Sequence, residues 1–596
     1  METQPVIEQQ ERIDDIPLLF GMMRRMQIAE IVDKHLGPHH LHQGLSNGNL
    51  VVGWLAYLLS EADHRKFYVQ EWANSHLHTL QSLFGTPLRP HEFSDDRLGI
   101  VLNHFADADW DALEGDLFTS AFDVYELPTT VFRVDATASC GYHTIEPDGL
   151  MQLGHTKDHR PDLPQLKIMA AVTQPLAFPV STAIVPGNET DDGLYWFTIV
   201  KVKEKVGGSG LLFAGDCKMA ALDTRGRIAN AGDFYLTPLP NTGATAQQLG
   251  SWIDTALAKD DQNKLPAIHK PLAVAPAELI GKGYEFTRTQ QAPVDTREVS
   301  WTERVQVVQS VSHRDSQKEK LHKGLRQSEE KLAQLTLSGK GRKIWREEPE
   351  LRAAIAAIEK AHGVEGLLTI TLSQQVQERK KYSQPGRPTE TAVATVAVET
   401  RYQIAAVARN EEQIVAKEKR LGWRAFVTNA PVERLSLVAS VLTYREGGGL
   451  ERPFQNLKGE PLGIRPLWVK LPKQIMGLTR LLLIALRVLT LIQIVVRAQL
   501  AENKEKLGGM YEGQKSKMEG APTVQRTLRA IAGLEMTLSL IQMGEQQWWY
   551  LPALPPLLVR VLDLLGLSPT LYTNLTNPCP CLPLTSDART VPDPSG

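Results

Sequence analysis

The feature that most constrains this chain is a series of short apolar runs between residues 129 and 240, each about the length of a β-strand. Three of these runs are TTVFRVDATAS, QLKIMAAVTQ and LLFAGD. A helical pattern over 192–206 lies between the second and the third, and a second helix and another strand are expected over 217–231 and 233–240. Strands joined by a crossover helix give at least some parallel pairing. The sequence therefore predicts an α/β core.

The remaining sequence predicts several further structural regions, because 596 residues are too many for one ordinary hydrophobic core. Apolar residues spaced three and four apart indicate a helical N-terminal domain, whereas the stretch after the core loses the strand–helix rhythm until RAFVTN. We expect a multidomain α/β protein. Its predicted parts are 1–125 (helical), 126–240 (first part of the core), 241–400 (an insertion, strand-rich and then basic and helical), 401–500 (second part of the core), 501–578 (helical, with a helix beginning at Trp548) and 579–596 (a disordered tail).

Net charge limits the classes of partner. The chain carries a formal charge of −3, which argues against a protein that simply coats nucleic acid, since such a protein would be basic throughout. Basic surface is instead local: residues 313–346 contain ten Lys and Arg against four Asp and Glu. Such a helix is either a solvated face or a contact with a phosphate backbone.

Cysteine usage and the termini indicate a cytoplasmic protein. Four cysteines do not make a disulfide framework, and no His/Cys set has the spacing of a zinc site. No signal peptide is visible at the N-terminus. The apolar run 481–496 is interrupted by Arg487 and Gln493, so a buried core helix is expected there and no membrane partner.

Two aspartates mark a candidate catalytic site. Asp135 lies near the end of one predicted strand and Asp216 ends another. Strand carboxyl ends are where open α/β sheets place their sites, and paired carboxylates can hold the two divalent cations used for in-line displacement at phosphorus. Each aspartate taken alone is more typical of a turn or helix cap.

A third carboxylate follows in the segment TYREGGGLERPFQNLKG. Tyr444, Glu451 and Lys458 are spaced by seven residues, so Glu451 and Lys458 share one helix face. Glu451 could complete a metal site and Lys458 could meet a DNA phosphate. An amphipathic helix with a solvated charged face has the same pattern.

These residues carry a resemblance to a known family. YREGGGLERPFQNLKG resembles the Tyr-Arg-Glu-Lys signature of a large group of bacterial insertion-sequence transposases, whose Glu is the last member of an Asp-Asp-Glu triad. VFRVDATA and LLFAGDCKM resemble the first two triad strands. GHTKDHRPDLPQLKIMA, PGNETDD and GWRAFVTN are similar to blocks of the branch with a long helical N-terminal domain. The motifs occur in the family's order from about residue 15 to 500.

The resemblance implies an RNase H-like catalytic core interrupted by a large insertion. It also implies a DDE transposase that uses two Mg²⁺ or Mn²⁺ ions, held by Asp135, Asp216 and Glu451, to cleave double-stranded DNA at terminal inverted repeats and join it to target DNA. A homodimer on the DNA ends is implied, and the N-terminal helices would serve end recognition or dimerisation. The alternatives are a related nuclease without strand transfer and a transposase-derived DNA-binding protein that lacks catalysis.

The signature departs from the family at one position. Gly447 stands where the signature has Arg, so Arg445 is a substitute only if the chain bends, and the glycine run disfavours helix before Leu450. Glu446 is an alternative third carboxylate. Other candidate DNA contacts are basic or aromatic residues near these motifs or in turns. Two of them, His155 and His159, could instead ligate metal or lie in a solvated loop. These candidates are Tyr444, Arg445, Lys218, His155, Lys157, His159, Arg160 and Arg387.

Overall fold

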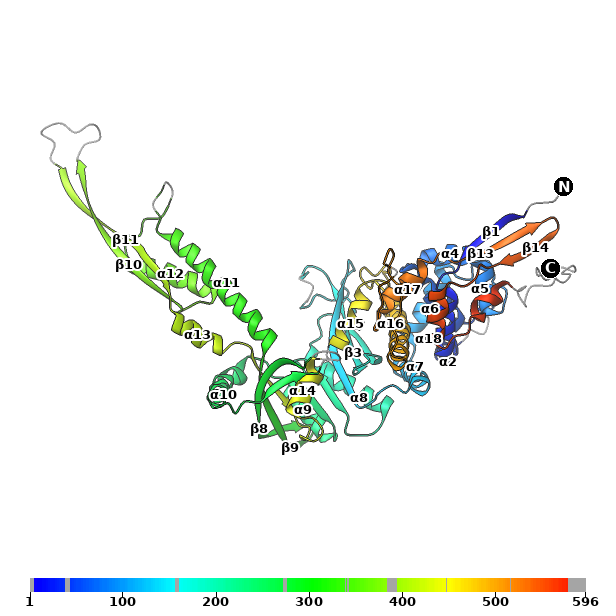
Figure 1. Cartoon of the computed structure of the whole chain (residues 1–596), viewed down its shortest axis with the longest axis horizontal. Helices are drawn as coiled ribbons and strands as arrows, with labels where there is room; N and C mark the ends of the chain where they lie inside the picture. Colours follow the sequence, from blue (N-terminus) through cyan, green and yellow to red (C-terminus); the bar gives the residue numbers. More distant parts are fainter. Residues whose placement is uncertain are drawn as a thin grey trace. The chain divides into compact units, whose positions relative to one another are not determined.

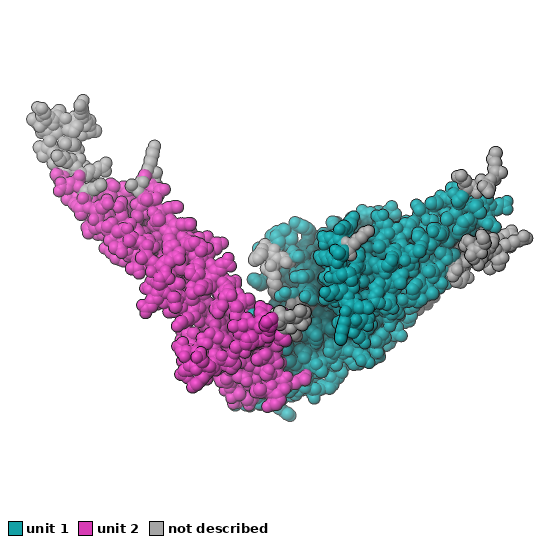
Figure 2. All heavy atoms as spheres, viewed as in Figure 1, with its two compact units in different colours: residues 1–237, 291–301, 443–596 teal, residues 238–290, 302–442 magenta. Residues whose placement is uncertain are grey.

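The computed structural model divides the chain into two compact units, coloured separately in Figure 2. The first unit comprises Met1–Thr237, Gln291–Trp301 and Thr443–Gly596, and the second comprises Pro238–Gln290 and Thr302–Leu442. The structure describes residues 5–37, 43–155, 160–271, 276–337, 339, 342–382, 394–445, 448–514 and 516–576. The tail expected to be disordered, 579–596, lies outside these ranges.

The predicted N-terminal helices are present in the first unit (Figure 1). They are α1 (Ile16–Arg25), α2 (Ile28–Leu36), α3 (Asn47–Glu61), α4 (Val69–Ser75), α5 (Leu77–Phe84), α6 (Asp95–Asp107) and α7 (Trp110–Tyr125), with a short 3₁₀ turn at Lys66–Tyr68. Side-chain caps fix two of their starts: Ser46 accepts a hydrogen bond from Asn49 N, and Asp109 accepts one from Ala112 N. Before them lies a strand that the helical prediction for 1–125 missed, β1 (Val6–Arg12).

The apolar run at 481–496 forms the middle of α16 (Pro472–Glu502), which packs against α6. This helix is long and apolar enough to cross a membrane, but 78% of its most apolar window is buried inside the protein. At Gly477 the helix backbones approach so closely that an added Cβ would lie 2.0 Å from the carbonyl oxygen of Leu102. The expectation of a buried core helix is confirmed.

Mixed β-structure confirms the α/β prediction: the strands of the first unit have the order β4-β3-β2-β5-β6, and those of the second have the order β12-β9-β8-β7. Strands β2, β3 and β4 are antiparallel, whereas β5 runs parallel to both β2 and β6. The bounds in the first unit are β2 (Val131–Cys140), β3 (Gln165–Thr173), β4 (Pro179–Pro186), α8 (Asp191–Val206), β5 (Leu212–Gly215), α9 (Leu222–Asn230) and β6 (Phe234–Pro238). The helix expected over 217–231 thus begins five residues late, at Leu222, after a turn.

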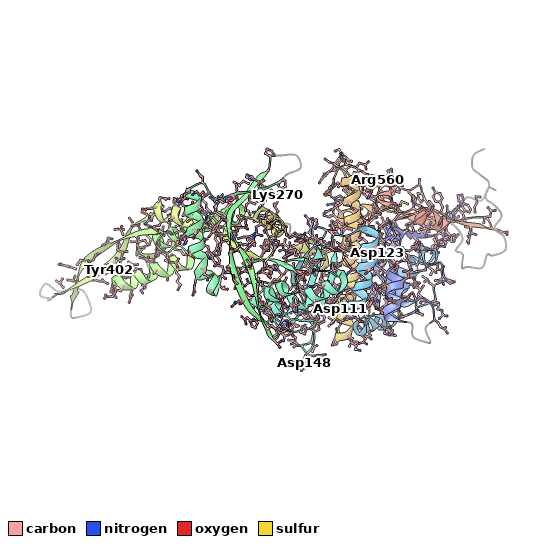
Figure 3. The ribbon with its side chains drawn as sticks, turned by 90° about the horizontal axis from the view of Figure 1, so that it is seen from below. Asp111, Asp123, Asp148, Lys270, Tyr402 and Arg560 are labelled. Carbon is pink, nitrogen blue, oxygen red and sulfur yellow. The ribbon has the colours of Figure 1, made fainter. Side chains whose placement is uncertain are left out.

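The second unit contains the strand-rich and basic helical sequence expected for the insertion. Its elements are α10 (Gly243–Asp261), β7 (Ala267–Lys270), most of β8 (Glu278–Val294), the larger part of β9 (Arg297–Ser310), α11 (Val311–Leu335), α12 (Glu348–His362), β10 (Leu368–Tyr382), β11 (Ala394–Arg409), α13 (Glu411–Lys419), β12 (Trp423–Thr428) and the first part of α14 (Leu437–Arg445). Strands β10 and β11 form an antiparallel ribbon. Tyr402 of this ribbon, labelled in Figure 3, packs against a core that includes Leu325 of α11 and Leu351 of α12.

The prediction of a helix that begins at Trp548 is wrong. Residues 537–550 instead form a hairpin, β13 (Thr537–Met543) and β14 (Gln546–Tyr550), which pairs with β1 in a three-stranded sheet. Gly544 supplies the positive φ that the hairpin turn needs, and β1 supplies a third strand from the other end of the chain. The remaining C-terminal helices are α17 (Val524–Ala532) and α18 (Pro556–Leu564), which contact α16, and α19 (Thr570–Thr573), which contacts α1.

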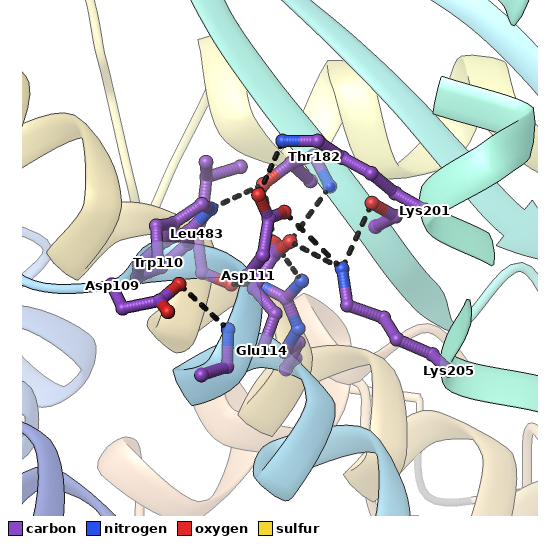
Figure 4. A network of polar contacts seen from close by, with 11 residues as sticks. Asp109, Trp110, Asp111, Glu114, Thr182, Lys201, Lys205 and Leu483 are labelled. Atoms are coloured by element: carbon purple, nitrogen blue, oxygen red, sulfur yellow. Dashed lines mark hydrogen bonds and ion pairs between the residues drawn. The ribbon is translucent and has the colours of Figure 1, made fainter. Parts of the chain in front are cut away.

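A buried ionic network joins the N-terminal helices to the sheet (Figure 4). The carboxylate of Glu114 on α7 contacts Arg487 of α16, and both side chains are 0% exposed. Its Oε2 accepts a hydrogen bond from Thr182 N of β4 at 3.0 Å and lies 3.3 Å from Lys205 Nζ of α8. Residues of α7, α16, β4 and α8 therefore meet at one buried carboxylate.

Candidate active site

Asp135 and Asp216 lie side by side on neighbouring parallel strands. Val134 of β2 is paired with Gly215 of β5, so the next residue of each strand is the aspartate. Asp216 directly follows β5, as predicted. Asp135 is not at the end of its strand, because β2 runs on to Cys140 through its pairing with β3. It lies where the parallel pairing with β5 ends, and this brings the two aspartates together.

The carboxylate of Asp216 is held by two donors on one oxygen. Its Oδ1 accepts hydrogen bonds from Tyr195 Oη at 2.5 Å and from Lys218 N at 2.9 Å. Its backbone oxygen accepts a hydrogen bond from Thr237 Oγ1 at 2.6 Å. Asp216 itself is partly exposed, whereas Tyr195 is 1% exposed. The side chain is thus fixed from the protein interior and remains accessible.

Nearby carboxylates raise the pKa of the Tyr195 hydroxyl and of the Cys217 thiol. Burial, followed by the negative charges of Asp216 and then Asp135, holds the pKa of the Tyr195 hydroxyl well above its usual range. Burial and then the charge of Asp216 also raise the pKa of the Cys217 thiol. Asp135 and Asp216 therefore act together on one buried hydroxyl, which places their negative charges in the same small region.

A pocket of about 270 Å³ adjoins this pair. Its lining includes Ala136, which follows Asp135, together with Lys218 and charged residues of β3 and the start of α8. Lys167 of β3 donates a hydrogen bond to Asp191 Oδ1 at 2.9 Å and is 11% exposed. Lys218 is 3.9 Å from Asp192 in an exposed pair, a geometry that contributes little stability. Cationic and anionic side chains thus face the same small space.

Glu451 is on a helix, as predicted, and this helix packs against the strand of Asp135. α15 (Gly448–Lys458) contacts β2 and α16, and Phe454 packs on Val172 and Ala177. Glu451 itself is exposed, and Lys458, on the same helix, is half-buried. Among the described residues, no group of three or more His, Cys, Asp or Glu side chains is placed to hold one metal ion. The structure therefore brings two of the three predicted carboxylates together.

Tyr444 and Arg445 end α14, before the start of α15. The guanidinium of Arg133, on the strand of Asp135, lies 4.8 Å from the centroid of the Tyr444 ring and donates a hydrogen bond to Tyr444 O at 3.3 Å. Arg445 is exposed. Glu446 and Gly447 lie outside the described residues. The DNA contacts of Tyr444 and Arg445 stay predictions.

The loop before β3 is described in part. His155 is exposed and lines the same pocket as Lys167 and Lys218. Arg160 forms an ion pair with Asp162 at 2.7 Å and lies 6.0 Å from the ring centroid of Tyr142. Lys157 and His159, like Arg387 in the insertion, are outside the described ranges.

Sequence reasoning missed two residues of this site, Tyr195 and Lys167. Tyr195 lies one helical turn after Asp191 in α8, where the apolar pattern of the helix makes it look like a core residue. Lys167 is the charged residue inside an apolar strand, QLKIMAAVT, and that interruption was a usable signal. Its side chain points to the pocket and not into the core.

The fold and the site define a mixed α/β protein with a large sheet flanked by helices and two aspartates paired at adjacent parallel strands. A family model described as a domain of unknown function, DUF4277, matches residues 8–118, which include most of β1 and most of the N-terminal helices. No curated protein matches the sequence. A cryo-EM structure of the piggyBac transposase synaptic complex with hairpin DNA matches with a TM-score of 0.31 and 8% identity, covering 98% of this chain and 90% of that chain.

Proposed function

We propose that this chain is a DDE transposase that cleaves DNA at the ends of its element and joins them to target DNA. The observation that carries the proposal is the placement of Asp135 and Asp216 side by side on the parallel strands β2 and β5. Two neighbouring carboxylates supply the hard oxygen ligands that Mg²⁺ and Mn²⁺ prefer.

The strand order supports an RNase H-like core. Numbered from β2, the first-unit strands have the spatial order 3-2-1-4-5, with the first three antiparallel and the last two parallel to the first. This is the arrangement expected for the core that the sequence motifs imply. The first aspartate lies on the first of these strands and the second follows the fourth.

The residues present fit a divalent cation in part. Both aspartates are partly exposed, and Asp216 directs Oδ1 toward interior donors, which leaves Oδ2 for a cation. Glu451 is on a helix that packs against β2, and we propose that it joins the two aspartates when DNA is bound. Bound cations would activate a water or a 3′-hydroxyl and stabilise the leaving oxygen. Lys218, Lys167 and His155 would meet the phosphate.

The test is cleavage of DNA that carries the sequences flanking the coding region, in the presence of Mn²⁺. Asp135→Ala, Asp216→Ala and Glu451→Ala are expected to retain DNA binding and to lose cleavage by at least about a thousandfold. Glu460→Ala is the matched control for Glu451, because Glu460 is an exposed acid just after the same helix that forms an ion pair with exposed Arg529. It should cut like the parent.

Three outcomes separate the alternatives. Cutting at the element boundary followed by joining supports a transposase, whereas cutting without joining identifies a nuclease. If the parent binds the ends and never cuts, the chain is a DNA-binding protein that lacks catalysis. Full activity of Glu451→Ala would show that another acid is the third carboxylate of the triad, and Glu446 is the first candidate.

A further inference from the structure

The hydroxyl of Tyr195 is the feature of the site that neither the motifs nor the proposed chemistry uses. Tyr195 is 1% exposed on α8, yet its hydroxyl is directed outward to the partly exposed carboxylate of Asp216. A buried tyrosine hydroxyl needs a partner, but a neutral backbone oxygen would satisfy it. Here the partner is a carboxylate, and a second carboxylate, Asp135, is close enough to act on the same hydroxyl.

The two donors to Asp216 come from different parts of the fold. Lys218 N belongs to the turn that follows Asp216, so it holds Oδ1 locally. Tyr195 Oη approaches from a helix packed on the sheet, so it fixes the rotation of the carboxylate relative to β2. With both donors on Oδ1, Oδ2 accepts no hydrogen bond from the rest of the described chain. The oxygen that remains free is the one available to a cation.

We infer that Tyr195 is a positioning residue for the metal site: its hydroxyl holds Oδ1 of Asp216 so that Oδ2 is presented, with Asp135, to a divalent cation. This inference rests on the proposed function. Groups that hydrogen-bond a ligating carboxylate orient it, and their loss typically lowers metal affinity or activity by about 10- to 100-fold. Tyr195 does not touch the DNA or the reacting atoms in this account.

The experiment measures Mn²⁺ binding to the full chain without DNA, with calorimetric titration and the EPR signal of free Mn²⁺ as the two readouts. Tyr195→Phe removes one oxygen and keeps the ring, and we expect its dissociation constant to rise by about tenfold or more. Tyr235→Phe is the matched control, because Tyr235 is also fully buried in the first unit and its hydroxyl accepts a hydrogen bond from Trp301 Nε1 at 2.9 Å. This control should bind Mn²⁺ like the parent.

The readouts distinguish the two proposals. If the parent binds Mn²⁺ no more tightly than Asp216→Ala does, the metal site of the proposed function fails and the role of Tyr195 fails with it. If the parent binds Mn²⁺ and Asp216→Ala does not, but Tyr195→Phe binds like the parent, only the positioning role is overturned. Equal weakening by Tyr235→Phe would also overturn it, because the effect would then be a general consequence of removing a buried hydroxyl.

Discussion

Replacing Glu114 by Gln tests whether the buried ionic network holds the first unit together. Gln keeps the size of the side chain and can still accept the hydrogen bond from Thr182 N. It removes the negative charge beside Arg487, whose side chain is 0% exposed. Of the remaining acceptors, Leu483 O is 3.0 Å from Arg487 Nη1, but a carbonyl does not neutralise a guanidinium. The variant therefore leaves a buried cation without its counter-ion.

The expected cost follows from that uncompensated charge. Breaking a buried ion pair by removing one partner costs about 3–5 kcal/mol. The first unit has about 400 residues, and at ~2.1 cal/mol/K per residue its unfolding entropy is about 0.8 kcal/mol/K. The midpoint temperature of the thermal unfolding of this unit should fall by about 4–6 °C. Lys205 keeps a second partner, Asp111, at 3.6 Å, so the loss should be confined to Arg487.

Differential scanning calorimetry of the full chain measures this shift. Asp107→Asn is the control, because it breaks an exposed ion pair with Lys473 that should contribute less than about 1 kcal/mol. The double variant Glu114→Gln/Arg487→Met should recover most of the loss, since it removes the unpaired cation. A shift in Glu114→Gln no larger than in Asp107→Asn, or a double variant as unstable as the sum of the single variants, would refute the reasoning.

Three further outcomes are expected. Burial raises the pKa of Asp15 to about 6, so the folded state holds this proton more tightly than the unfolded state does. The stability that this proton contributes is therefore lost as pH rises from about 4 to 6. Thermal unfolding should show that Asp15→Asn stabilises the protein by about 2–3 kcal/mol at pH 8 and hardly at pH 4. Because burial and Asp216 raise the pKa of the Cys217 thiol, Asp216→Asn should increase its alkylation rate by iodoacetamide at pH 7.5 several-fold, by peptide mass spectrometry, and an unchanged rate would contradict this electrostatic account. Gly477→Ala should lower the melting temperature, because its Cβ would lie 2.0 Å from a backbone oxygen. Gly193→Ala, whose Cβ would have nothing within 4 Å, should raise stability by about 0.5–1 kcal/mol. Equal effects of the two substitutions would argue against the close approach of the helices at Gly477.

The placement of Asp135 and Asp216 side by side was only partly within reach of the sequence. The apolar runs and the helix at 192–206 predict some parallel pairing, but that helix follows the run QLKIMAAVTQ, whereas the strand that pairs with β5 is β2. The error about Asp135 has a similar origin. The sequence showed where apolar character weakens, but pairing with β3 continues the strand to Cys140. Strand ends depend on the partner strand, which a single run does not reveal.

Long-range partners were beyond the sequence. Arg487 was visible as an interruption of an apolar run, but its counter-ion Glu114 is 373 residues away. In the same way, β13 and β14 lacked their third strand until β1 was placed beside them, so a strand-forming segment was assigned to a helix. Tyr195 had no signal of its own, since an aromatic residue on the inner face of a helix is ordinarily core. Its hydroxyl acquires meaning only from Asp216.

The position of Glu114 also bears on what the N-terminal region can be. The family match ends at residue 118, so Glu114 belongs to the matched segment, while Thr182 and Arg487 do not. Trp110, in the same segment, donates a hydrogen bond to Thr182 Oγ1 at 3.1 Å. Removing residues 8–118 would therefore leave Arg487 without its counter-ion and expose the apolar face of α16 that α6 covers. These helices are thus part of the structure that supports the sheet of Asp135 and Asp216. A recognition role for them would have to use their outer surface, because the inner one is occupied by the core.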